Sequence, residues 1–155
     1  MTARLFIDTN ILIYALDPAE PIKRAISADL LRRTTANHTL VLSPQNLNEC
    51  YRVLSQRRRF VDEAAARSYL TQLMPWCIAP LDAQTTLKAW AVQDEAGLAW
   101  WDALLVASAL MAGCRLFVSE DLQDGRTIAG MRIANPFTAE FSKRAEVDQS
   151  GRRSS

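Results

Sequence analysis

The chain has 155 residues, of which 49% are hydrophobic and 23% are charged, and 18 Lys and Arg oppose 17 Asp and Glu to give a formal charge of +1. This length and composition predict one globular domain with a single hydrophobic core. The balanced charge excludes a protein that coats nucleic acid through a uniformly positive surface. Any nucleic-acid binding would need local patches.

Histidine and cysteine usage narrows the chemistry further. The single histidine, His38, lies in a polar turn, where we expect it to be exposed. One histidine excludes a nuclease with a His acid–base pair and a His-rich zinc site. The sequence has three cysteines, Cys50, Cys77 and Cys114, and no Cys-x-x-Cys pair, so neither a zinc site nor a disulfide framework is expected. The cysteine usage predicts a reducing cytoplasm. Because the sequence has no long apolar run, we expect no membrane contact.

Short apolar segments alternate with helical patterns along the chain. Strands are expected at residues 5–7, 40–42, 77–78, 115–118 and 131–134. Helices are expected at residues 11–16, 20–35, 44–57, 61–74, 82–95 and 101–112. The alternation is typical of an α/β fold with three layers, a central parallel sheet flanked by helices. Residues 143–155 are polar and are expected to form a disordered tail, which leaves residues 1–142 as the domain.

Two aspartates follow predicted strands closely. Asp8 comes directly after the strand at 5–7, and Asp121 comes three residues after the strand at 115–118. Ligands of parallel α/β sheets bind at the carboxyl ends of the strands. We therefore expect Asp8 and Asp121 to face one crevice.

Two further carboxylates lie in core-like sequence, Glu49 on the helix after Pro44 and Asp102 beside Trp101. Taken singly, each of the four acids has an ordinary explanation as a helix cap, a dipole partner, a turn residue or a surface residue. Together they would repel one another unless a divalent cation neutralised them. Oxygen ligands without imidazole or thiolate favour Mg²⁺ or Mn²⁺, ions that act on phosphate groups.

Four short segments carry a pattern that goes beyond these separate acids. They are Phe-Ile-Asp-Thr-Asn-Ile-Leu at 6–12, Asn-Leu-Asn-Glu at 46–49, Trp-Asp-Ala-Leu-Leu-Val-Ala at 101–107 and Val-Ser-Glu-Asp-Leu-Gln-Asp-Gly at 118–125. In order and spacing they resemble the PIN-domain ribonuclease family, and the chain looks like its VapC-like toxin branch. The resemblance covers residues 1 to about 138.

The resemblance implies a PIN-like, Rossmann-like sheet and an endoribonuclease that uses one or two Mg²⁺ or Mn²⁺ ions. It also assigns the site. The implied catalytic and metal-binding residues are Asp8, Glu49, Asp102 and Asp121. The implied supporting residues are Thr9, Asn10, Asn46, Ser119 and Asp124. Bound ions would orient the scissile phosphate and activate a water molecule, so no histidine is needed.

The resemblance also implies partners. Toxin relatives pair with themselves and with an antitoxin, so we expect a homodimer, a cognate antitoxin and an RNA substrate. Arg57, Arg58 and Arg59 are candidate contacts for RNA phosphates, with a solvated helix end as the simpler alternative. Trp100 and Trp101 are expected to pack in the core or between subunits rather than to stack on a base.

Two other functions stay open. A haloacid-dehalogenase-like phosphatase would also place an aspartate after its first strand, but it needs a carboxylate two residues later, where this chain has Asn10. A PIN-like module that binds RNA or protein without cleaving it is compatible with the same residues. Four intact acids favour the nuclease over this alternative.

Overall fold

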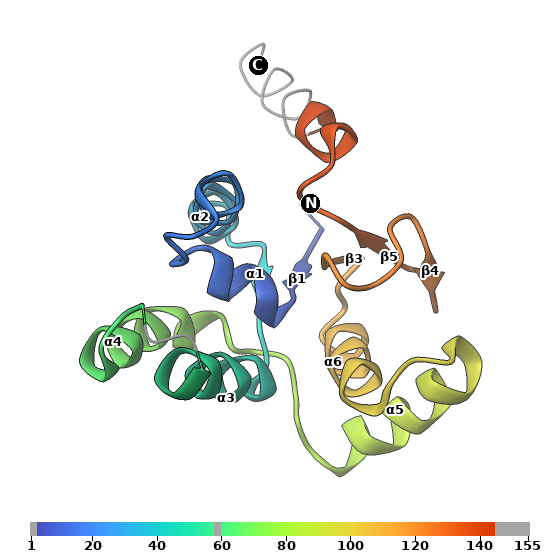
Figure 1. Cartoon of the computed structure of the whole chain (residues 1–155). Helices are drawn as coiled ribbons and strands as arrows, with labels where there is room; N and C mark the ends of the chain where they lie inside the picture. Colours follow the sequence, from blue (N-terminus) through green and yellow to red (C-terminus); the bar gives the residue numbers. More distant parts are fainter. Residues whose placement is uncertain (1–2, 58–59, 145–155) are drawn as a thin grey trace.

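The computed structural model describes residues 3–57 and 60–144. Within them, the strands are β1 (Leu5–Ile7), β2 (Leu40–Val41), β3 (Leu116–Val118), β4 (Thr127–Ile128) and β5 (Met131–Ala134). They form a sheet in the order β2-β1-β3-β5-β4, which is parallel except for the β4–β5 pair (Figure 1). The predicted α/β fold with a central parallel sheet is confirmed.

The antiparallel edge strand β4 was not predicted. Ala129 and Gly130 connect it to β5, and both have positive φ angles, 48° and 85°. Two such residues between paired strands form the tight hairpin turn whose twist matches the strands. An Ala-Gly pair is a weak turn signal compared with Asn-Gly, and a two-residue strand has no periodicity to detect.

The helices agree closely with the expected ranges. They are α1 (Thr9–Tyr14), α2 (Pro21–Ala36), α3 (Pro44–Arg52), α4 (Glu63–Leu73), α5 (Ala83–Ala96) and α6 (Trp100–Met111). The predicted helix to residue 57 is realised as α3 followed by a π-helical turn, η1 (Val53–Arg57). Ser43 and Asn46 form a reciprocal cap at the start of α3, where Pro44 occupies the first turn.

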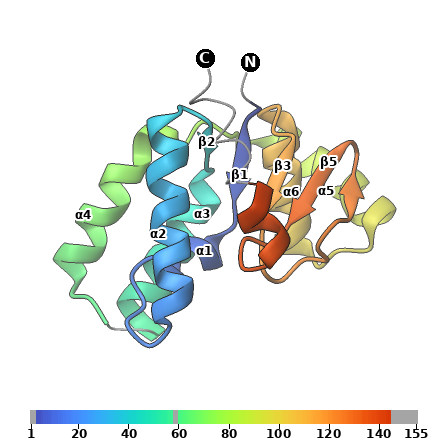
Figure 2. The same cartoon turned by 90° about the horizontal axis from the view of Figure 1, so that it is seen from above.

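Alternating side chains divide the core between the two faces of the sheet. Phe6 and Phe117 point to one face, where their rings stack at 5.2 Å, and α5 and α6 cover them. Ile7 and Val118 point to the other face, which α1 to α4 cover. Figure 2 shows the sheet between these two groups of helices. All four of these side chains are fully buried, as the three-layer arrangement requires.

The predicted strand at residues 77–78 is wrong. The chain there leaves a short 3₁₀ turn, η2 (Met74–Trp76), and makes only two main-chain hydrogen bonds to Leu42. Leu42 N donates to Trp76 O at 2.9 Å, and Ala79 N donates to Leu42 O at 3.0 Å. Pro75 and Pro80 flank the segment and lack the N–H groups that a longer ladder would need.

The two tryptophans at the start of α6 differ. Trp100 packs against the core on the α5–α6 face, as expected, whereas Trp101 is 64% exposed. Core packing of Trp101 is therefore excluded within this chain. His38 is exposed in a turn, as predicted, with its ring 5.5 Å from that of Trp76.

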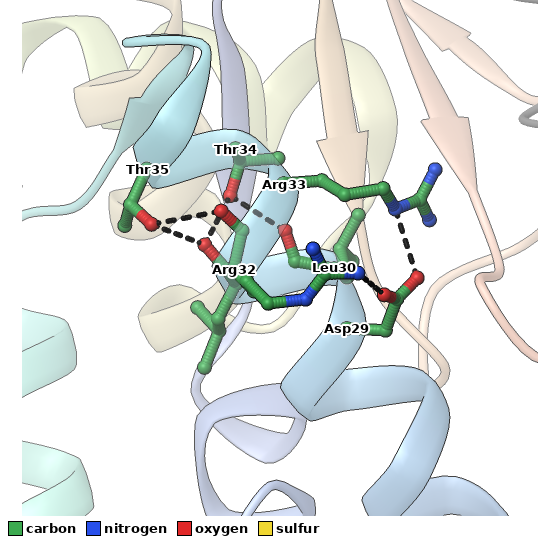
Figure 3. Close-up of polar contacts among 7 residues, drawn as sticks. Asp29, Leu30, Arg32, Arg33, Thr34 and Thr35 are labelled. Atoms are coloured by element: carbon green, nitrogen blue, oxygen red, sulfur yellow. Dashed lines mark hydrogen bonds and ion pairs between the residues drawn. The ribbon is translucent and has the colours of Figure 1, made fainter. Parts of the chain in front are cut away.

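The cations near the end of α2 are engaged locally. Asp29 forms ion pairs with both Arg32 and Arg33 (Figure 3). In the same segment, the hydroxyl groups of Thr34 and Thr35 donate hydrogen bonds to main-chain carbonyl oxygens of the preceding turn. Short-range pairs of this kind are ordinary features of a helix surface.

The end of the chain is only partly described. Residues 139–144 are helical, so the boundary expected after residue 142 falls within a helical segment. The rest of the predicted tail, residues 145–155, lies outside the described residues. None of the helices that the structure describes has the length and apolar character needed to cross a membrane.

Candidate active site

Asp8 lies where β1 ends and α1 begins, and both of its carboxylate oxygens accept hydrogen bonds. Oδ1 accepts from Thr9 N at 2.7 Å, and Oδ2 accepts from Ser119 Oγ at 2.8 Å. The pKa of Asp8 is raised from 3.8 to about 7, chiefly by burial. The charges of Asp102 and Asp121 also raise it, and the two hydrogen bonds oppose the rise without cancelling it. The protein around Asp8 therefore stabilises its negative charge poorly.

Thr9 and Asn46 link Glu49 to the end of β1, where Asp8 lies. Thr9 Oγ1 donates to Glu49 Oε2 at 2.9 Å and accepts from Asn46 Nδ2 at 3.3 Å. Asn46, which is fully buried, also donates to the main-chain oxygen of Ile7 at 3.2 Å. The predicted supporting residues Thr9 and Asn46 thus connect the end of β1 to α3.

Gln45 is a contact of this site that the sequence analysis missed. Its Nε2 donates to Glu49 Oε1 at 2.8 Å and to the main-chain oxygen of Trp101 at 3.0 Å. Its Oε1 is buried and has no hydrogen-bond partner among the described residues. Gln45 therefore connects Glu49 to the first turn of α6, which carries Asp102. The sequence signal for this contact was the spacing of four residues between Gln45 and Glu49 on one helix.

Asp102 lies in the first turn of α6 and is half-buried. Within the described part of the chain, its carboxylate accepts no hydrogen bond. Burial raises its pKa, and the charges of Asp121 and Glu49 raise it further. The negative charge of Asp102 is therefore destabilised by its surroundings, although Asp102 lies in the first turn of a helix.

Asp121 approaches from the loop after β3. Its carboxylate accepts a hydrogen bond from Asn10 Nδ2, and its main-chain N–H donates to Ser119 Oγ at 3.2 Å. Ser119 therefore contacts Asp8 and Asp121 at once and is itself fully buried. This pairing arises because β1 and β3 are parallel neighbours, with Asp8 N donating to Val118 O at 2.9 Å.

The four predicted acids form one electrostatic group. The pKa of Asp8 responds to Asp102 and Asp121, and that of Asp102 responds to Asp121 and Glu49. Among residues 3–57 and 60–144, no lysine or arginine forms an ion pair with any of the four. Within the described residues, the group therefore collects negative charge without an ion pair to a basic side chain.

The donor set fits a hard divalent cation in its chemistry. Every acid offers oxygen ligands, and neither thiolate nor imidazole lies in the group, which matches Mg²⁺ or Mn²⁺. In the present side-chain positions, the described residues contain no group of three or more His, Cys, Asp or Glu arranged to hold a metal. Hydroxyl and amide donors from Thr9, Ser119, Asn10 and Gln45 instead occupy carboxylate oxygens that an ion would use.

Two predicted residue groups lie apart from these contacts. Asp124 is exposed and accepts a hydrogen bond from Asn135 N at 2.9 Å, so its carboxylate connects the loop between β3 and β4 to the residue that follows β5. Arg57 lies at the end of η1 and is exposed. Arg58 and Arg59 lie outside the described residues.

A family model described as "PIN domain" matches residues 5–124, about three-quarters of the chain and all four acids. The chain belongs to the PIN domain family. This confirms the resemblance stated from the four sequence segments. No match was found among curated proteins.

Solved structures similar to this PIN domain come from bacterial VapBC systems. VapBC from Salmonella typhimurium, bound to DNA, has a TM-score of 0.62 at 15% identity and covers 87% of this chain and 99% of that chain. VapBC2 from Rickettsia felis, bound to a fragment of its promoter, has a TM-score of 0.59 at 17% identity, with 84% and 97% covered. VapC20 from Mycobacterium tuberculosis, described as a Sarcin-Ricin loop cleaving toxin, has a TM-score of 0.54 at 17% identity, with 83% and 98% covered. At these identities the likeness establishes the fold.

Proposed function

We propose that this PIN domain is an endoribonuclease that depends on Mg²⁺ or Mn²⁺ and acts as the toxin of a toxin–antitoxin pair. The observation that carries the proposal is the convergence of Asp8, Glu49, Asp102 and Asp121, none of which forms an ion pair with a described lysine or arginine. Such a group costs free energy unless a cation balances it. The fold it shares with VapC proteins, one of them described as cleaving the Sarcin-Ricin loop, supports RNA as the substrate.

The residues around the four acids have different roles in the proposed reaction. Ser119 and the Thr9 N–H fix both oxygens of Asp8, while Thr9 and Gln45 fix those of Glu49. Asp102, which accepts no hydrogen bond among the described residues, is free to turn toward a bound cation. When bound, one or two ions would lower the pKa of a water molecule and offset charge on the phosphate oxygens. The surrounding side chains would hold the acids in place for that step.

The phosphatase alternative has little support from the site. A haloacid-dehalogenase-like enzyme would need a proton-carrying group at position 10, but Asn10 donates its amide hydrogen to Asp121. Hydrolysis of p-nitrophenyl phosphate by the wild type would favour that reading. A PIN-like module that only binds RNA or protein predicts no cleavage of any RNA.

Cleavage of labelled RNA tests the proposal. Wild-type protein is incubated with single-stranded and structured RNA in Mg²⁺, in Mn²⁺ and in EDTA, beside Asp8→Asn, Glu49→Gln and Asp102→Asn. We expect cleavage with the metals only and a loss of at least about 100-fold in each variant. Asp124→Asn is the matched control, because it neutralises an exposed acid outside the group. Equal cleavage in EDTA, or wild-type rates in two of the three variants, contradicts the proposal.

The proposed partners follow from the same likeness. Two of the similar structures are VapBC complexes, which supports a cognate antitoxin for this chain. We propose that the antitoxin reaches the acidic group with a basic side chain, since no described residue of this chain supplies one there. A homodimer is proposed on the exposed apolar side chains of α5 and α6, among them Leu87, Trp90 and Trp101.

A further inference from the structure

A cavity of about 420 Å³ lies beside the acidic group. Its described lining residues are Asn10, Ile13, Tyr14, Val53, Arg57 and Asp121. Asn10 and Asp121 belong to the acidic site, so the cavity begins where that site ends. Its volume falls within the range of about 300–1,000 Å³ that is typical of pockets for small ligands. We call it the Arg57 cavity.

The walls of the Arg57 cavity differ in character. Ile13, Tyr14 and Val53 supply apolar surface, while Asn10 and Asp121 supply polar groups on the side of the acids. This combination of apolar walls with a few polar groups suits the base and ribose of a nucleotide, which have flat faces and polar edges.

Arg57 is the cation among the described residues that line the cavity. It has no ion pair with a described carboxylate and is exposed. Val53 and Arg57 are four residues apart in the π-helical turn η1, which brings both to the same wall. Turns of this kind occur often at functional sites.

Lys23, a described cation beside the Tyr14 wall of the cavity, is already paired with a carboxylate. Lys23 Nζ lies 2.8 Å from Glu120 Oε2 and 4.9 Å from the centre of the Tyr14 ring. Tyr14 Oη donates to Glu120 Oε1 at 2.9 Å, which fixes the ring that lines the cavity. Among the described residues that line the cavity, Arg57 is therefore the side chain that can balance a phosphate approaching the four acids.

We propose that the Arg57 cavity binds one nucleotide of an RNA strand next to the scissile phosphate, with the Arg57 guanidinium on a backbone phosphate. The inference rests on the proposed nuclease function for the position of the cut. Phosphate contacts fix the register of a strand without reading its sequence. Arg57 would thus hold RNA in place in a manner that tolerates different sequences.

Binding measurements that need no cleavage test this inference. The fluorescence anisotropy of a labelled 12-nucleotide single-stranded RNA is followed with Asp102→Asn and with the double variant Asp102→Asn, Arg57→Ala. We expect removal of Arg57 to weaken binding about 3- to 10-fold and to reduce the slope of log K against log salt by about 0.7. Arg57→Lys should keep most of the affinity, because it keeps the charge.

The matched control is Arg115→Ala in the same background. Arg115 is exposed and directly precedes β3, at the opposite end of that strand from Ser119 and Asp121, so its removal deletes one charge away from the cavity. We expect less than about a twofold change in affinity for this control. Equal weakening by both variants would mean that the chain attracts RNA by general charge only, and this would overturn the inference.

A second probe locates the site. Uridine 5′-monophosphate has no phosphodiester bond, and its titration into the isotope-labelled wild type should shift the NMR signals of Ile13 and Val53. Val53→Phe, which narrows the cavity, should reduce the shift of the Ile13 signal. Shifts confined to other parts of the chain, or none in this wall, would contradict the inference.

The outcomes separate this inference from the nuclease proposal. If Arg57→Ala weakens RNA binding but the wild type cleaves no RNA, the cavity assignment stands and the nuclease proposal falls. If the wild type cleaves RNA and Arg57→Ala binds and cleaves as Arg115→Ala does, the cavity assignment falls and the nuclease proposal stands. In that second case the cavity is left for a protein partner.

Discussion

Ser119 Oγ donates a hydrogen bond of 2.8 Å to Asp8 Oδ2 across 111 positions of sequence. The same hydroxyl oxygen accepts from the main-chain N–H of Asp121 at 3.2 Å. One buried serine thus joins the carboxyl ends of β1 and β3 and sets the spacing between two of the four acids. The contact is possible because these strands are parallel neighbours in the sheet.

The raised pKa of Asp8 predicts how stability depends on pH. The folded-state pKa is about 7, above the ordinary value of 3.8, so protonation of Asp8 favours the folded state. Its contribution is fully present below about pH 4 and is lost as the pH rises through about 7, on the order of 4 kcal/mol at most. Relative to wild type, metal-free Asp8→Asn should therefore gain stability from pH 4 to pH 8.

Urea denaturation in metal-free buffer at several pH values measures this difference. The quantity to follow is the free energy of unfolding of Asp8→Asn minus that of the wild type. Asp124→Asn serves as the control, because it removes an exposed carboxylate outside the acidic group. A pH-independent difference for Asp8→Asn would mean that Asp8 is not destabilised by its surroundings.

Gln45 is predicted to position Glu49 and the start of α6. Gln45→Ala removes two hydrogen bonds, which should lower the free energy of unfolding by about 1–2 kcal/mol. If Gln45 has only a structural role, this loss of stability is the whole effect of the substitution. A positioning role also raises the Mn²⁺ concentration needed for half-maximal thermal stabilisation, by about 10-fold or more.

The control for Gln45 is Asn48→Ala. Asn48 lies on the same helix, is exposed and bonds to the main-chain oxygen of Pro44. Its removal should leave the Mn²⁺ response unchanged. If Gln45→Ala lowers stability and leaves the Mn²⁺ response as in Asn48→Ala, Gln45 does not position the site.

A homodimer is the third expectation. Leu87, Trp90 and Trp101 are all more than half exposed, and large apolar side chains of this kind favour association. Sedimentation at tens of micromolar should give the mass of two chains, because an interface of standard size associates in this range. Trp90→Glu with Trp101→Glu should shift the protein to monomer. A monomeric wild type would contradict the expectation.

Much of the site could be predicted from the strand assignments and from the resemblance to the family. Asp8 and Asp121 follow strands, and parallel strands bring their carboxyl ends together, so their meeting followed from the strand assignments alone. Glu49 and Asp102 lie on helices, and their place in the group came from the resemblance to the family. In the structure, charge interactions link Asp8, Asp102 and Asp121, and Asp102 also interacts with Glu49.

The features that were missed depend on packing between distant segments. Gln45 reads as an ordinary helix residue, and its bond to the main-chain oxygen of Trp101, 56 positions away, exists only because α3 lies beside the start of α6. The exposure of Trp101 has the same origin, since the neighbouring Trp100 takes the place against the core. Residues 77–78 have apolar character but too few hydrogen-bonding neighbours for a strand.

Thermal melts across a Mn²⁺ titration test the central claim most directly, that the four acids form a cation site. In the wild type the melting temperature should rise with the Mn²⁺ concentration by mass action. At a Mn²⁺ concentration of 100 times the dissociation constant, the gain in the free energy of unfolding is about 2.7 kcal/mol. Asp102→Asn should melt at the wild-type temperature or higher in EDTA, because it relieves repulsion from Asp121 and Glu49, and its response to Mn²⁺ should shrink or vanish. A lower melting temperature of Asp102→Asn in EDTA, together with an unchanged Mn²⁺ response, would make Asp102 a structural residue and contradict the account.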